Sequence, residues 1–295
     1  MQNSTPDVTT LSLSFPQTFL PDRDLLARLI RFAANNGSGD KETISTETGI
    51  PTGKSTGKVE PMIRYAQGMG LVKAEKNEGV WRLRLTPLGQ TVSEQDRALS
   101  EPVTQWLLHL MLCRRVGLAT PATGVADAWF LLFGEGAVRL GKRFTQADYL
   151  AALQERHGSK AALKTLASLV LRNYFEPKAF GSITALQKEE SPDGEQFFIR
   201  QSVPFKPDYF PAYTAYLYLL WDEFFSGQVQ IDFDEFAAQT RLLALFGWVE
   251  GQIANWLDWM TNHGSIKVDR HTGTPILLRL QKTDTVLAGL YDGLI

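Results

Sequence analysis

The chain has 295 residues, of which 44% are hydrophobic, 21% charged and 11% aromatic. This balance is typical of a folded globular protein and excludes an intrinsically disordered one. The 30 lysines and arginines against 32 aspartates and glutamates give a formal net charge of −2. Any attraction to a polyanion must therefore come from a local patch. The length predicts about two domains.

The sequence predicts a cytoplasmic protein with no membrane segment. The longest charge-free aromatic run, Tyr209 to Trp221, is shorter than the ~20 residues that cross a bilayer. The first residues, Met1 to Asp7, lack the basic start and apolar core of an export signal. Cys113 is the only cysteine, which excludes an internal disulfide.

Residues 1–19 are expected to form a tail with a short strand, because Leu11, Leu13 and Phe15 alternate with serines. Residues 20–92 have a different pattern. Apolar residues at helical spacing follow Asp24, Asp40 is a candidate N-cap for a helix over 41–48, and a third helix is expected from near Lys58. Two strand-like stretches, 71–75 and 80–85, come next. Three short helices followed by a hairpin predict a winged helix-turn-helix domain.

Residues 93–225 are expected to form a helical middle domain. Apolar stripes at helical spacing cover 103–111 and 125–133, and an aromatic helix covers 213–224. Two strand-like stretches, 182–186 and 197–203, flank a turn signal, which leaves a degenerate winged unit as an alternative.

Residues 226–295 repeat features of the first domain and are expected to form a second winged-helix-like unit. The matching residues share one constant offset: Gly57, Val59, Ile63, Tyr65, Gly70, Val72 and Lys73 align with Gly251, Ile253, Leu257, Trp259, Gly264, Ile266 and Lys267. The fold class predicted for the whole chain is mainly α with small β-hairpins, within the α+β class.

The segment from Gly49 to Thr56 resembles a phosphate-binding Walker loop only superficially. Three residues separate its glycines instead of four, and the segment before it is polar and helical rather than a buried strand. We interpret it as a flexible turn that presents Lys54, Ser55 and Thr56 to a DNA backbone.

A basic patch is the main evidence for a DNA-binding function. Between Lys54 and Arg84, seven lysines and arginines face three glutamates, an excess of four positive charges in a chain that is negative overall. The predicted contacts with double-stranded DNA are Lys54, Ser55, Thr56, Lys58, Arg64, Gln67, Lys73, Lys76, Arg82 and Arg84. This prediction requires the cations to share one exposed face. The alternative is that the domain docks another protein.

The C-terminal copy has a different charge. Its expected recognition helix, Gly251 to His263, has no lysine or arginine, and residues 204–262 hold eight acidic residues against Lys206 and Arg241. We expect it to bind a protein partner or to form a homodimer through Trp256 and Trp259. The basic residues between Arg139 and Lys178 are an alternative extension of a DNA footprint.

No catalytic set, cofactor site or metal site is predicted. The four histidines, His109, His157, His263 and His271, have no metal-ligand spacing among themselves or with Cys113. His109 and Cys113 lie on an apolar helix and are interpreted as core residues. The chain is therefore expected not to be an enzyme.

Several segments together resemble the prokaryotic family catalogued as domain of unknown function 4007. They are Phe15 to Phe19 with Arg23, Thr52 to Lys58, Met62 to Tyr65, Leu85 to Gly89, Trp106 to His109, Ala128 to Phe130 and Phe144-Thr145. The resemblance implies a role in DNA phosphorothioation or linked anti-phage restriction, with PAPS-reductase-like and ATPase partners. An autonomous transcriptional regulator and a protein adaptor without DNA binding remain alternatives.

Overall fold

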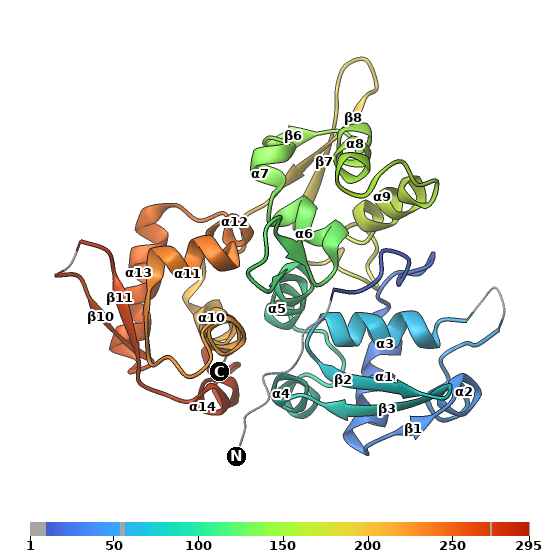
Figure 1. Ribbon diagram of the computed structural model, residues 1–295, viewed down its shortest axis with the longest axis horizontal. Coiled ribbons are helices and arrows are strands. Elements are labelled where there is room, and N and C mark those ends of the chain that lie inside the picture. Colours follow the sequence, from blue (N-terminus) through green and yellow to red (C-terminus); the bar gives the residue numbers. More distant parts are fainter. Residues whose placement is uncertain (1–9, 54–56, 272, 295) are drawn as a thin grey trace.

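The computed structural model describes residues 10–53, 57–271 and 273–294. In this part of the chain, three small three-stranded antiparallel sheets follow one another along the sequence, and a two-stranded sheet lies between the first and the second (Figure 1). Each three-stranded sheet places its first strand next to its third: the orders are β1-β3-β2, β6-β8-β7 and β9-β11-β10. The mixed α+β class predicted from the sequence is confirmed. Within the described ranges, no helix is long and apolar enough to span a membrane.

The N-terminal unit, residues 23–95, begins with a helix that packs on its sheet. Its elements are α1 (Arg23–Ala34), β1 (Ser38–Gly39), α2 (Lys41–Thr48), α3 (Val59–Gly68), β2 (Val72–Asn77), β3 (Val80–Leu85) and α4 (Pro87–Gln95). Asp40 caps α2 as predicted, and hydrogen bonds from Thr43 lower the pKa of its carboxyl. Glu78 and Gly79 both have positive φ, the geometry of a tight two-residue hairpin turn between β2 and β3.

The middle unit, residues 127–200, has the same strand arrangement. Its elements are α6 (Asp127–Phe133), α7 (Gly136–Arg139), β6 (Arg143–Phe144), α8 (Gln146–His157), α9 (Ala162–Arg172), β7 (Leu186–Glu190) and β8 (Gln196–Arg200). The predicted strand over 182–186 is wrong in position, since β7 begins only at Leu186. The strand order is the same as in the N-terminal unit, whereas the alternative of a degenerate winged unit stays a prediction.

The C-terminal unit, residues 207–294, repeats the arrangement again. Its elements are η1 (Pro207–Tyr209), α10 (Phe210–Phe224), β9 (Gln230–Asp232), α11 (Phe233–Thr240), α12 (Leu242–Phe246), α13 (Glu250–Asn262), β10 (Ile266–Asp269), β11 (Ile276–Arg279), α14 (Thr283–Ala288) and η2 (Asp292–Leu294). The internal repeat inferred from the sequence therefore has a counterpart in the order of helices and strands.

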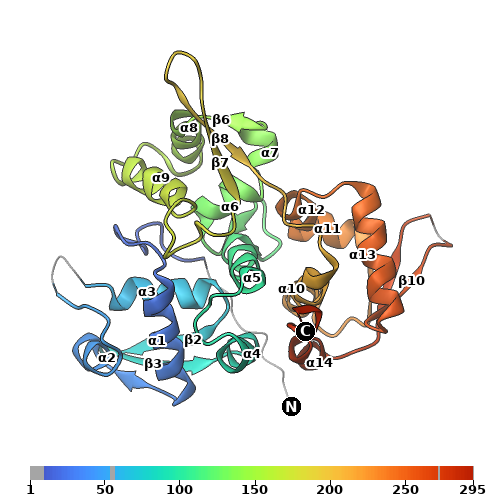
Figure 2. The same cartoon turned by 180° about the vertical axis from the view of Figure 1, so that it is seen from behind.

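Helix α5 (Pro102–Cys113) and the short hairpin of β4 (Arg115–Val116) and β5 (Thr123–Gly124) lie between these units. Both views place α5 at the centre of the molecule, beside α10 (Figures 1 and 2). The hydroxyls of Thr104 and Tyr291 are 2.7 Å apart and link α5 to the C-terminal end. One continuous hydrophobic core extends from Leu11 to Tyr291, so it crosses every predicted domain boundary. Those boundaries stay a prediction.

The predicted strand near the N-terminus is wrong. Residues 13–18 form consecutive turns, with Phe15 N donating to Ser12 O and Gln17 N donating to Ser14 O. Leu11 N donates to Val125 O at 2.7 Å, a single bond to a distant segment rather than a strand ladder. Local hydrogen bonds at the serines compete with strand pairing, so the apolar residues are buried through turns instead.

Gly89 allows α4 to start against the backbone of Leu71, the residue that precedes β2. A Cβ at this position would lie 1.9 Å from the Leu71 carbonyl oxygen, which already accepts from Thr86 N. We expect Gly89→Ala to lower the free energy of unfolding by about 2–4 kcal/mol, because backbone must move to relieve the overlap. Gly251→Ala is the matched control: it is also in a helix but has nothing within 4 Å of its added carbon. Urea denaturation of both variants measures the difference, and equal stability would contradict this explanation.

Candidate nucleic-acid interface

The predicted DNA-binding residues divide between the two faces of the N-terminal sheet. Lys73 lies opposite Arg84 and Glu75 opposite Arg82 in the β2–β3 ladder, and directly opposed residues point to the same side. Lys73, Arg82 and Arg84 are exposed, whereas the alternating residues Trp81 and Leu83 are fully buried. We call the side with these three cations the outer face. Helix α1 covers the opposite side of the sheet, behind it in Figure 1 and in front of it in Figure 2.

Acidic residues neutralise only part of the positive charge on the outer face. Glu75 is the one acidic side chain placed opposite these cations in the ladder, across from Arg82. Neither Lys73 nor the two arginines form an ion pair with any residue that the structure describes. Their positive charges therefore remain available to an external anion.

Arg64 and Lys76 belong to the other side. Both cations lie 4.9 Å from the ring centroid of Trp81, which points toward the helices. Arg64 also donates to the Gln67 amide oxygen at 3.0 Å. Lys76 pairs with Glu60 at 3.6 Å, so its charge is partly neutralised. The polar groups of Arg64, Gln67 and Lys76, which are predicted to contact DNA, are therefore already engaged within the protein.

Helix α3 offers too little exposed surface to enter a major groove as predicted. Seven of its ten residues are buried, and the remaining three, Glu60, Arg64 and Gln67, are only half-exposed. The N-terminal segment covers it: the Phe15 ring lies 5.0 Å from that of Tyr65, whose hydroxyl donates to Phe19 O. A groove-inserted helix needs an exposed face along its length. The requirement that all the cations share one face is therefore not met.

The remaining predicted contacts lie near the start of α3. Lys58 precedes this helix and is half-exposed, with its Nζ 5.7 Å from the Phe19 ring centroid. Lys54, Ser55 and Thr56 lie outside the described residues.

In the C-terminal unit, the two predicted tryptophan anchors have different environments. Trp256 is fully buried, with its ring 5.5 Å from Phe246 and 5.7 Å from Trp248. Trp256 is therefore a core residue, and its prediction as a partner contact is corrected. Trp259 is half-buried, so part of its ring remains accessible.

Four of the eight basic residues between Arg139 and Lys178 form ion pairs with described residues, Arg156 among them. Arg139 pairs with Glu135 and Glu155, Arg143 with Glu189, and Lys178 with Asp24. These pairs weaken the alternative that this region extends a DNA footprint.

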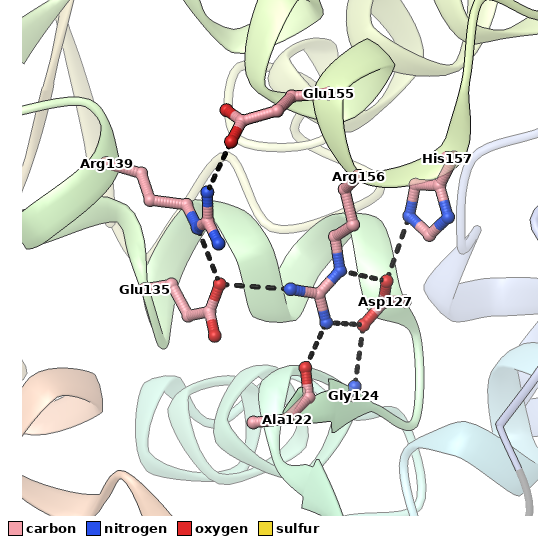
Figure 3. Close-up of polar contacts among 8 residues, drawn as sticks. All are labelled: Ala122, Gly124, Asp127, Glu135, Arg139, Glu155, Arg156 and His157. Carbon is pink, nitrogen blue, oxygen red and sulfur yellow. Dashed lines mark hydrogen bonds and ion pairs between the residues drawn. The ribbon is translucent and has the colours of Figure 1, made fainter. Parts of the chain in front are cut away.

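A buried ion network explains the role of several charged residues in this region (Figure 3). Asp127, 4% exposed, accepts from Arg156 Nε at 2.6 Å and Nη2 at 2.8 Å, and from the Gly124 amide at 2.7 Å. Arg156 also donates to Ala122 O and to Glu135. The network thus joins α6, α8 and the β4–β5 hairpin, which is a structural role.

His157 completes the network on its exposed side. Its Nε2 lies 2.9 Å from Asp127 Oδ2. Burial lowers the pKa of His157, and the nearby positive charges of Arg156 and Lys160 act in the same direction, while Asp127 opposes them.

A second buried cluster contains a histidine, a cysteine and a tyrosine, side chains that act as bases or nucleophiles in many active sites. His109 Nδ1 lies 2.9 Å from the Tyr174 hydroxyl and 3.5 Å from Cys113 Sγ. His109 is 1% exposed and Cys113 is fully buried. Burial lowers the pKa of His109 to about 3 and raises the pKa of the Cys113 thiol. A neutral imidazole and a thiol without solvent access do not form a nucleophilic pair, so the interpretation of both as core residues is confirmed.

Comparisons with known proteins place this fold beside that of SspB. A magnesium-bound SspB crystal structure superposes with a TM-score of 0.71 at 16% identity, over 98% of this chain and 91% of SspB. A second SspB crystal structure gives a TM-score of 0.67 at 16% identity, over 96% and 88%. At this identity the similarity concerns the fold. No family model matches the chain, and no curated protein matches it.

Magnesium in one of those structures raises the question of a metal site here. Among the residues whose positions are described, no group of three or more histidine, cysteine, aspartate or glutamate side chains could hold a metal ion.

Proposed function

We propose that this chain is a component of a prokaryotic DNA phosphorothioation system or of the anti-phage restriction linked to it. SspB is a phosphorothioation-associated protein, and the similarity in fold extends over almost the whole of both chains. The resemblance of the sequence to the domain of unknown function 4007 family suggests the same setting, although no family model confirms that membership. Within it, we propose a cytoplasmic binding subunit rather than an enzyme.

The proposed binding target is duplex DNA, and the proposed contact surface is the outer face of the N-terminal sheet. We interpret residues 23–85 as a winged helix-turn-helix unit, because three helices and a three-stranded sheet follow in the order typical of that fold. The observation that carries the proposal is the exposure of three cations without ion-pair partners among the described residues, Lys73, Arg82 and Arg84, in a chain with net charge −2. Contacts of this kind hold phosphates and do not select sequence.

The salt dependence of binding tests this surface. Three neutralised phosphates predict a slope of about −2.7 for the logarithm of affinity against the logarithm of salt concentration. Fluorescence anisotropy with a labelled duplex of about 20 base pairs, from low salt upward, measures it. A slope near zero, or no binding at low salt, contradicts the proposal.

A protein adaptor without DNA binding is the second candidate, and the burial of most of α3 favours it. In that case both the N-terminal and the C-terminal units would contact other proteins, including PAPS-reductase-like and ATPase components. Copurification of a stoichiometric complex that is unaffected by nuclease, together with the absence of duplex binding, would support this candidate. Homodimer formation stays a prediction.

A further inference from the structure

The C-terminal unit contains a cleft of about 680 Å³ between α10, α13 and the chain end around α14 and η2. Two carboxylates line it: Asp208 from η1 and Asp292 from η2. The two turns lie against each other, because a Cβ on Gly293 would be 2.4 Å from the Asp208 carbonyl oxygen. The cleft therefore brings together residues from the two ends of the unit.

The charge of this cleft is uncompensated. No lysine or arginine is among its described lining residues. Asp208 and Asp292 are both exposed, and neither forms an ion pair within the described part of the chain. A cation that entered would find two negative charges without a competing internal partner.

A serine side chain also lines the cleft. Ser265 is 7% exposed and lines the cleft. Its backbone carbonyl accepts from Leu280 N at 3.0 Å and from the Tyr218 hydroxyl. Its side-chain oxygen has no hydrogen-bond partner among the described residues and is not fully buried. That oxygen is available to a donor inside the cleft.

One wall of the cleft is aromatic. The rings of Trp259 and His263 are stacked, with centroids 4.0 Å apart and an interplanar angle of 22°. His263 Nδ1 lies 2.8 Å from the Trp259 carbonyl oxygen, which holds the imidazole in this orientation. Flat aromatic surfaces of this kind favour planar cations, since a guanidinium packs against them and is weakly hydrated.

We propose that this cleft binds an arginine side chain of a partner polypeptide. A guanidinium carries one positive charge and five donors in a plane. The two carboxylates supply complementary charge, Ser265 Oγ supplies an acceptor, and the Trp259–His263 stack supplies a flat wall. This proposal deepens the partner-binding role of the proposed function but does not depend on contact with DNA.

The proposal is tested by NMR titration of the ¹⁵N-labelled full-length protein, with the indole N–H signal of Trp259 as the reporter. This signal is assigned as the one that is missing from the spectrum of Trp259→Phe. The probe is the peptide acetyl-Gly-Arg-Gly-amide, and the matched probe replaces arginine with citrulline, which has the same shape without the charge. We expect a saturable shift with the arginine peptide and binding at least about tenfold weaker with citrulline, because charge-assisted hydrogen bonds are lost. A double variant, Asp208→Asn with Asp292→Asn, should weaken the arginine peptide by a similar factor.

Asp258→Asn is the control for net charge. Asp258 lies on the same helix as Trp259 but is paired with Arg270 at 2.7 Å and does not line the cleft. Its replacement should leave peptide binding unchanged. Three results would each overturn the proposal. They are an affinity for the citrulline peptide equal to that for the arginine peptide, no shift with either peptide, and an affinity for free L-arginine equal to that for the arginine peptide. Duplex affinity of the Asp208/Asp292 variant, measured separately, should equal that of the unmodified protein whichever way the peptide experiment ends.

Discussion

Replacement of Asp127 by alanine is expected to lower the free energy of unfolding by about 3–5 kcal/mol, because it leaves a buried arginine without its main partner. The Arg156 side chain is 9% exposed and contacts Asp127 through two nitrogens. Glu135, at 3.0 Å, would compensate only part of that charge. The shift in the urea midpoint, with circular dichroism as the signal, measures the effect.

Two controls separate a buried pair from a surface one. Glu155→Ala removes a carboxylate whose side chain is 73% exposed and 3.4 Å from Arg139, so the expected loss is below about 1 kcal/mol. In the double variant Asp127→Ala with Arg156→Met, no unpaired buried charge remains, and part of the lost stability should return. If the double variant is no more stable than Asp127→Ala, the loss comes from another contact, such as the Gly124 amide bond.

The sequence predicted best those features that local chemistry determines. The Asp40 cap depends on an amide three residues away, and the β2–β3 hairpin depends on the turn at Glu78-Gly79. Alternate residues of a strand face opposite sides of the sheet. The sequence alone therefore predicts that Arg82 and Arg84 lie on one side of the sheet and Trp81 on the other. Applied to the basic patch, this alternation alone divides its cations between the two sides of the sheet.

The errors concern residues whose surroundings come from distant segments. The burial of α3 depends on Phe15 and Trp129, which pack their rings against Tyr65 from positions about fifty and sixty residues away. Trp256 is expected as a partner contact because its helix has no lysine or arginine and lies in an acidic region. Its burial comes from Phe246 and Trp248, which precede that helix. Helical spacing alone does not show which partner will cover a given face.

The N-terminal and C-terminal units differ in the residues on the outer faces of their sheets. The exposed side of β3 in the N-terminal unit carries Arg82 and Arg84, whereas the corresponding side of β11 carries Ile276 and Leu278, opposite Asp232 and Gln230. Repeated architecture with different surface chemistry is consistent with units that contact different classes of partner. A single hydrophobic core through all three units would keep such contacts at fixed distances from one another.

Reversal of charge at Arg82 and Arg84 is expected to weaken duplex binding by about a hundredfold at low salt, because each lost charge-assisted contact contributes about 1.5 kcal/mol. Arg82→Glu with Arg84→Glu keeps the buried residues of β3 unchanged, so the fold should persist. The proper comparison is Arg28→Glu with Arg31→Glu, which makes the same change in net charge at exposed positions of α1, on the opposite side of the sheet.

Anisotropy titrations of both double variants decide between a specific surface and a general effect of charge. If the outer face binds DNA, the α1 variant should retain affinity within about threefold, since its charges lie away from the phosphates. Equal weakening of both variants would mean that only net charge matters, and no weakening of either would place the duplex contact outside the N-terminal sheet face. Lys73→Glu, added to the first variant, should reduce the salt slope further toward zero, because it removes the last cation of that face.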